Sequence, residues 1–86
     1  MVNFQRKERY DWEDLLTIMR ILRAPGGCPW DREQTHQSIR RNFLEETYEA
    51  LDAIDRDSAP DMQEELGDVL LQVVFHSVME EEQGRF

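Results

Sequence analysis

Glycine and proline fall at few positions in this 86-residue sequence, and between them apolar residues recur with the period of an α-helix. Two prolines and two glycines lie within residues 25–29, so the segment 24–31 is predicted to be a shaped, non-helical loop. A second break, at 56–60, reads as a short turn that ends in Pro60. No stretch alternates with a period of two residues, so no β-strand is expected. The sequence therefore predicts an all-α fold.

The sequence predicts three helices, over residues 11–23, 35–55 and 59–82. Asp11 and Ser58 can cap the first and third helices, and Gly84 can end the third. Because the turn between the second and third helices is short, these two should pack antiparallel as a helical hairpin. Residues 1–10 are polar and basic, and we expect them to form an arm outside a helical domain that spans 11–86.

The composition is strongly acidic: 19 Asp and Glu against 10 Lys and Arg give a formal net charge of −9. This balance argues against a nucleic-acid or membrane-surface binder, because such proteins present a basic face. It suits a protein that concentrates divalent cations. The single cysteine, Cys28, allows no intramolecular disulfide and favours a reducing cytoplasm. The N-terminal residues lack the apolar segment of a signal peptide, and no apolar run is long enough to span a bilayer.

The length of the chain limits its core. A chain of this size buries only about 60% of the surface that its unfolded form exposes, so a partner chain, a metal or further sequence should add stability. The helix at 59–82 carries a dense apolar run, and a lone three-helix piece would leave much of it exposed. We therefore expect a bundle of antiparallel helices completed by dimerisation, as a homodimer or a higher homo-oligomer.

Two pairs of carboxylates mark the predicted helical hairpin. Glu46 and Glu49 are three residues apart, and each therefore shares a helix face with the other. The same spacing separates Glu65 from Asp68 on the following helix. Antiparallel packing lets the two pairs face one another, with Glu45 at the margin of the first pair. Both pairs adjoin apolar positions, which places them beside the core.

Four carboxylates that converge beside a core repel one another and are poorly hydrated. A divalent cation removes that repulsion, and oxygen-only ligands suit Mg²⁺ or Mn²⁺. Carboxylates that leave metal positions free also suit a phosphate substrate. The alternative is an ordinary solvated acidic face, which helical proteins often carry and which we expect at residues 80–82.

At these carboxylates the sequence resembles the MazG family of nucleotide pyrophosphohydrolases. The family pattern is EExxE followed by ExxD, found here at residues 45–49 and 65–68. The resemblance extends over nearly everything from about residue 12 onward, including residues 27–31, 34–36, 42–44 and 84–86. EExxE alone is a weak signal, whereas the ordered set at this spacing is a strong one.

The resemblance implies an all-α fold of related dimeric enzymes in which helices from two chains build a bundle. It implies Mg²⁺-dependent cleavage of a nucleoside triphosphate between its α and β phosphates, which yields a monophosphate and pyrophosphate. It also implies a metal-ligand set of Glu46, Glu49, Glu65 and Asp68. Glu45 or Glu49 would be the catalytic base for the attacking water.

Family domains continue with further helices beyond the position of Phe86, and those helices carry basic residues that help to hold the phosphates. We therefore expect the helical domain to be truncated at its C-terminus. This leaves a second hypothesis open: a catalytically incomplete module that binds nucleotide or metal, or that dimerises, without turnover. The sequence does not discriminate among bases.

Several other residues have a functional and a structural interpretation. The candidates for substrate binding are Arg40, Arg41, Trp30 and His36. The arginines could clamp phosphate or balance the neighbouring acids at the surface, as could Arg23 at the end of the first helix. Trp30 could stack on a base or plug the hairpin. His36 has no nearby His or Cys in the sequence, so it does not predict a transition-metal site.

Five further residues have mainly structural interpretations. His76 is expected on the flank of its helix without a role, and Cys28 is expected to be a small packed side chain. Tyr48 and Phe43 are expected in the core. Gly67 lies inside a helix, where it costs about 1 kcal/mol relative to alanine. Either something approaches its backbone closely, or the helices pack tightly there.

Overall fold

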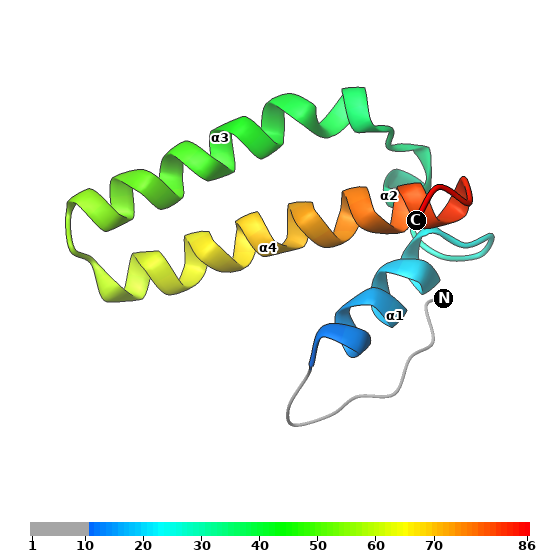
Figure 1. Ribbon diagram of the computed structural model, residues 1–86, viewed down its shortest axis with the longest axis horizontal. Helices are drawn as coiled ribbons and strands as arrows, with labels where there is room; N and C mark the ends of the chain where they lie inside the picture. Colours follow the sequence, from blue (N-terminus) through cyan, green and yellow to red (C-terminus); the bar gives the residue numbers. More distant parts are fainter. Residues whose placement is uncertain (1–10) are drawn as a thin grey trace.

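The computed structural model describes residues 11–86, and the predicted arm at 1–10 lies outside this range. Within the described residues the elements are four helices, α1 (Trp12–Arg23), α2 (Pro29–Glu33), α3 (His36–Asp55) and α4 (Ala59–Glu82). The helices α3 and α4 lie antiparallel along their length, and α1 lies against the later part of α4 (Figure 1). The predicted all-α fold is confirmed, with no strand in the part of the chain that the structure describes.

Side chains cap the three long helices where the sequence predicts that they begin. Asp11 accepts a hydrogen bond from the Asp14 backbone N–H (2.9 Å), and Thr35 accepts one from the Ser38 N–H (3.1 Å). In both cases the downstream side chain also accepts from the cap N–H, which completes a capping box. Ser58 accepts from the Asp61 N–H at the start of α4 (3.4 Å). Each cap satisfies backbone donors that the first turn leaves unpaired.

The prediction of a non-helical loop at 24–31 is wrong in one respect. Residues 29–33 form the short helix α2. Pro29 is the first residue of α2, where its fixed φ suits the helix and its missing N–H costs nothing. Half-buried Cys28 is the N-cap residue. A Cβ on Gly27 would lie 2.2 Å from the Ile21 carbonyl oxygen, so the chain passes too close to α1 for any side chain there.

Arginines on α1 fix that helix to the end of α4. Arg20 donates two hydrogen bonds to the Glu81 carboxylate, both of 2.6 Å. Arg23 donates to Glu82 (2.7 and 2.9 Å) and also to the backbone oxygens of Asp31 (2.6 Å) and Gln34 (3.1 Å). Because these contacts occupy the guanidinium of Arg23 and leave its side chain only 8% exposed, the structural interpretation of this residue holds.

The core lies where α1, the start of α3 and the second half of α4 meet. Its buried apolar residues are Met19, Ile39, Val74, Phe75, Val78 and Met79. Nearer the α3–α4 turn, the helices pack through small side chains, with Ala50 5% exposed and Ala53 fully buried. Small residues at a helix contact let the two backbones approach closely. The turn itself is made by Asp57, whose φ of 53° is left-handed.

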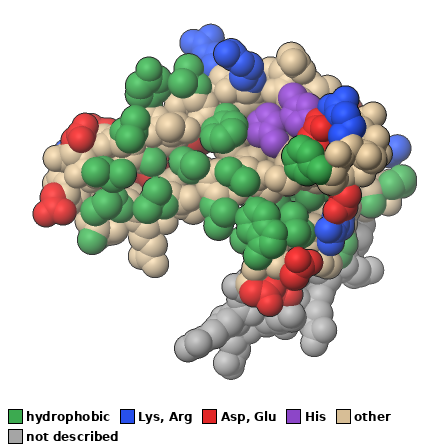
Figure 2. Space-filling view, viewed as in Figure 1, with side chains coloured by type: hydrophobic (Ala, Val, Ile, Leu, Met, Phe, Trp, Pro, Cys, Tyr) green, Lys and Arg blue, Asp and Glu red, His purple; other side chains and the backbone are tan. Residues whose placement is uncertain are grey.

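Large apolar side chains on the outer faces of α3 and α4 stay exposed in the single chain (Figure 2). They are Leu44, Tyr48, Leu51, Ile54, Leu66, Leu70, Leu71 and Val73. The core prediction for Tyr48 is wrong, since 64% of this residue is exposed. An exposed apolar face of this kind on two neighbouring helices is typical of an interaction surface. Among the described helices, none is both long and apolar enough to cross a membrane.

Gly67 lies in open space in the single chain, because a Cβ built on it meets nothing within 4 Å. The alternative of tight helix–helix packing within the chain is therefore wrong. Gly67→Ala should raise the free energy of unfolding by about 1 kcal/mol through helix propensity. Gly27→Ala, the same change at a crowded position, should lower it by about 1–3 kcal/mol. Urea unfolding of both variants without metal checks this, and a loss of stability in Gly67→Ala would contradict the open environment.

Candidate functional site

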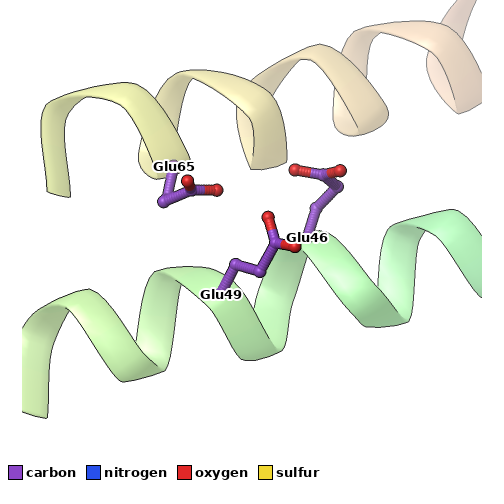
Figure 3. Close-up of side chains that lie close together, drawn as sticks. All are labelled: Glu46, Glu49 and Glu65. Atoms are coloured by element: carbon purple, nitrogen blue, oxygen red, sulfur yellow. The ribbon is translucent and has the colours of Figure 1, made fainter. Parts of the chain in front are cut away.

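Three carboxylates converge between α3 and α4 (Figure 3). Glu46 and Glu49 project from α3 toward α4, and Glu65 projects from α4 toward them. One carboxylate oxygen from each lies within 4.8 Å of the others, which is a spacing that a single metal ion can bridge. The predicted facing of acidic pairs is thus present for these three residues.

The fold brings these acids together for a local reason. Buried Ala50 and Ala53 follow the acidic pair on α3 and keep the two helices close near their connecting turn. The spacing of Glu46 and Glu49 places both on the same face as these alanines, toward α4. Glu65 meets them because α4 runs back antiparallel from the turn. Packing of the two helices therefore brings the carboxylates together, although the carboxylates repel one another.

Burial and mutual repulsion both act against ionisation here. Desolvation and the nearby charges of Glu49 and Asp68 raise the pKa of Glu46, and a hydrogen bond with Asp68 adds to the effect. Desolvation, hydrogen bonding with Glu49 and the charges of Glu49 and Asp68 raise the pKa of Glu65 to about 7. Asp68 therefore interacts with the cluster through Glu46, although it lies outside the three-oxygen group.

Two oxygens of the cluster lack any hydrogen-bond partner. Oε2 of Glu46 and Oε2 of Glu65 are both buried and unpartnered. A buried acceptor without a donor is costly, and two of them beside a third carboxylate form an environment that a cation would stabilise. The donor set consists of carboxylate oxygens only, which is the chemistry of hard divalent cations.

Residues 34–86 match the MazG nucleotide pyrophosphohydrolase domain, a segment that covers more than half of the chain and contains all of these carboxylates. The chain belongs to the MazG family. Over 73 residues it is 59% identical to a nucleoside triphosphate pyrophosphohydrolase of Escherichia coli K12. The aligned segment covers 84% of this chain and 28% of that protein.

Other MazG relatives match to a similar degree. The chain is 53% identical over 75 residues to the nucleoside triphosphate pyrophosphohydrolase/pyrophosphatase MazG of Thermotoga maritima, covering 87% of this chain and 29% of the relative. It is 51% identical over 78 residues to a nucleoside triphosphate pyrophosphohydrolase of Mycobacterium tuberculosis, covering 91% of this chain and 23% of the relative. The chain thus spans less than a third of the length of these curated relatives.

Glu45 does not join the carboxylate cluster of this MazG domain. It accepts a hydrogen bond from exposed Arg41 one turn earlier on α3, at 3.3 Å. Arg40 is exposed as well. Because Arg41 lies beside an acid on the surface, its geometry fits the structural interpretation as readily as a phosphate clamp. The charge of Glu45 still contributes to the raised pKa of Glu46.

His76, which was expected on the flank of its helix, contacts His36, although the two histidines are far apart in the sequence. The two rings stack with centroids 4.8 Å apart, and their Nδ1 atoms lie 2.5 Å apart. They form the purple pair in Figure 2. Burial, followed by the charge of His36, lowers the pKa of His76. Antiparallel packing brings together residues 40 positions apart, a contact that no sequence spacing signals.

In the acidic run at 80–82, Glu81 and Glu82 are exposed as expected, whereas Glu80 is largely covered. Glu80 accepts from His36 Nε2 (2.6 Å) and from Arg85, and its side chain is only 14% exposed. Hydrogen bonds from Arg85 and His36 lower the pKa of Glu80 to about 2. Glu81 and Glu82 pair with the arginines of α1. The run therefore fixes α1 and α3 to the end of α4.

Trp30 does not plug the hairpin, since 60% of it is exposed. Its ring meets Phe75 edge to face, with centroids 6.4 Å apart. Nearby, buried Gln72 donates from Nε2 to Asn42 Oδ1 at 2.6 Å. The sequence analysis assigned no function to these two amides. The signals in the sequence were the place of Asn42 in the family-like segment 42–44 and the position of each amide, one helical turn from Glu46 or from Asp68.

The raised pKa of Glu65 gives a pH-dependent stability with a defined sign. Its pKa in the folded chain, about 7, lies above its ordinary value of 4.5, so folding favours the protonated form. Its stabilising contribution is therefore complete below about pH 4.5 and is lost as the pH rises through about 7. Without metal, Glu65→Gln should become progressively more stable than wild type over this range. Urea unfolding in chelator measures the difference, and parallel stability profiles would contradict it.

Proposed function

We propose that this chain carries the metal-binding half of a Mg²⁺-dependent nucleoside triphosphate pyrophosphohydrolase. The observation that supports this most strongly is the cluster of Glu46, Glu49 and Glu65, which holds two buried oxygens without partners. Such a cluster is unfavourable alone and favourable around a cation. The proposed reaction class is taken from the names of the relatives. The proposed ion is inferred from the carboxylate ligands of the cluster.

The residues present fit a hard divalent cation. Glu46, Glu49 and Glu65 would hold Mg²⁺, with Asp68 beside Glu46 as the fourth ligand. All four offer oxygen, and no histidine or cysteine belongs to the cluster, so Mg²⁺ or Mn²⁺ suits it better than Zn²⁺. When bound, the ion would neutralise charge that develops on the phosphates and on the leaving group.

The proposed reaction is hydrolysis at the α-phosphorus. The oxygen of a water molecule forms a bond to that phosphorus, the bond from the phosphorus to the bridging oxygen of the β-phosphate breaks, and pyrophosphate leaves with its electron pair. Glu49 is the first candidate for the base that takes the proton of the water, because it is exposed and lies within the cluster. Glu45 is the second, at the surface beside Arg41.

Phosphate binding in this proposal draws on exposed arginines. Arg40 and Arg41 lie on α3 about one turn before the acidic cluster and can reach a bound triphosphate. The single cysteine and the use of triphosphates suit a reducing cytoplasm as the place of action. His36 is better explained as a structural residue, because both of its ring nitrogens already have partners.

A second function has its own supporting observation. The exposed apolar residues of α3 and α4, such as Leu44, Tyr48 and Leu66, would be covered in a homodimer or a higher homo-oligomer. A dimer that binds metal or nucleotide without turnover would use the same surfaces. The short span of the chain relative to its MazG relatives favours keeping this alternative.

The assay that tests the enzyme is pyrophosphate release from each nucleoside triphosphate with Mg²⁺. Glu49→Gln should lower the rate by about 10²–10⁴-fold, the range that a positioned proton-transfer group contributes. Asp68→Asn should also lower the rate, because it removes the charge of a proposed metal ligand. Glu64→Gln is a matched control, because it removes the same charge from an exposed residue next to Glu65. It should keep the rate within about threefold.

Full turnover in Glu49→Gln and Asp68→Asn would contradict the assignment of the site. Thermal stabilisation by Mg²⁺ and triphosphate without any pyrophosphate would instead favour the binding module. Light scattering of the same samples reports the oligomeric state. A monomer that turns over triphosphate would separate catalysis from dimerisation.

A further inference from the structure

A small pocket opens among all four helices, next to the carboxylate cluster but separate from it. Its volume is about 210 Å³. The core residues Met19, Ile39 and Phe75 form its apolar wall, and Trp30 stands at its edge with most of its ring exposed. Pockets for complete small-molecule ligands usually measure 300–1,000 Å³, so this one suits a single ring system.

The polar residues that line the pocket are the amides Asn42 and Gln72 and the acid Asp31. Gln72 is only 7% exposed and donates from Nε2 to Asn42. Its other amide atom, Oε1, is buried without any hydrogen-bond partner. A buried carbonyl oxygen of this kind needs a donor, and none of the described residues supplies one. A ligand ring with a hydrogen-bond donor on its edge would supply the donor that this oxygen lacks.

The position of the amides relative to the acids fits one kind of ligand. Asn42 lies four residues before Glu46 on α3, and Gln72 lies four residues after Asp68 on α4. At 1.5 Å per residue, both amides therefore lie about 6 Å further along the same helix faces. In a nucleotide, only the sugar separates the α-phosphate from the base. A base would thus reach the pocket when the carboxylates hold the metal and phosphates.

We propose that this pocket receives the nucleobase of the substrate, with Trp30 stacking on the ring and Gln72 Oε1 accepting from an exocyclic amino group. The inference rests on the proposed function, because it places the phosphates at the carboxylates. The hydrogen bond from Nε2 to Asn42 leaves Oε1 as the amide atom available to a ligand, so the glutamine acts as an acceptor. Asp31 also lines the pocket and adds a second acceptor. The pocket therefore selects adenine and cytosine over hypoxanthine and uracil, which carry a carbonyl at that position.

The test is binding of product nucleotides, which needs no turnover. In a Trp12→Phe chain, Trp30 is the remaining tryptophan, so its fluorescence reports stacking of a base. Adenosine monophosphate should quench it with an affinity about tenfold or more above that of inosine monophosphate. Cytidine monophosphate should exceed uridine monophosphate in the same way. Equal affinities within both pairs, or no quenching by any nucleotide, would overturn the proposal.

Two substitutions at one position assign the preference to Gln72. In the same Trp12→Phe background, Gln72→Leu removes one acceptor at similar volume and should lower both affinity ratios while quenching persists. Gln72→Glu keeps an acceptor and should keep the preference. An unchanged ratio in Gln72→Leu would overturn the role of the glutamine, with far-UV circular dichroism as the check on folding.

Failure of this proposal is distinguishable from failure of the enzyme. Pyrophosphate release at equal efficiency from adenosine and inosine triphosphates would reject base selection and leave the enzyme standing. Selective binding of the monophosphates without pyrophosphate release from any triphosphate would reject the enzyme and leave the base pocket standing.

Discussion

Close packing of α3 on α4 near their connecting turn is the constraint on which the rest of the site depends. Buried Ala50 and Ala53 let the helices approach, and this proximity pushes Glu46, Glu49 and Glu65 into one space. The crowding of these carboxylates raises the pKa values of Glu46 and Glu65. It also leaves one buried oxygen of each without a hydrogen-bond partner. Stability is thus lost at the position where a cation would restore it.

The opposite end of the hairpin is built on complementary charge. Glu80, Glu81 and Glu82 each meet a basic partner, and these contacts hold α1, the start of α3 and the residues after α4 together. Arg23 extends the network to the backbone around α2. As a result, α2 presents Trp30 beside Phe75 at the edge of the pocket. One end of the hairpin is therefore electrostatically satisfied, whereas the carboxylate end is not.

The exposed apolar residues connect the fold to its family context. A chain that spans less than a third of the length of its curated relatives carries the five acidic residues of the MazG pattern, together with an apolar outer face on α3 and α4. The hairpin packs against α1 through α4, and this contact leaves that face exposed. The acids and the apolar face lie on the same two helices. A partner that covered the apolar face would therefore affect the geometry of the carboxylate cluster.

The sequence by itself determined the three long helices and the faces of the acids, but not α2. Caps, Gly/Pro breaks and the i, i+3 spacing act within a few residues, so Asp11, Ser58 and the pair Glu46 and Glu49 could be predicted locally. Only the tertiary structure decided the contact of His36 with His76, the amide pair at Gln72 and the burial of Glu80. These contacts join residues 30 to 44 positions apart, and their partners depend on the register of the packed helices, which local spacing does not encode.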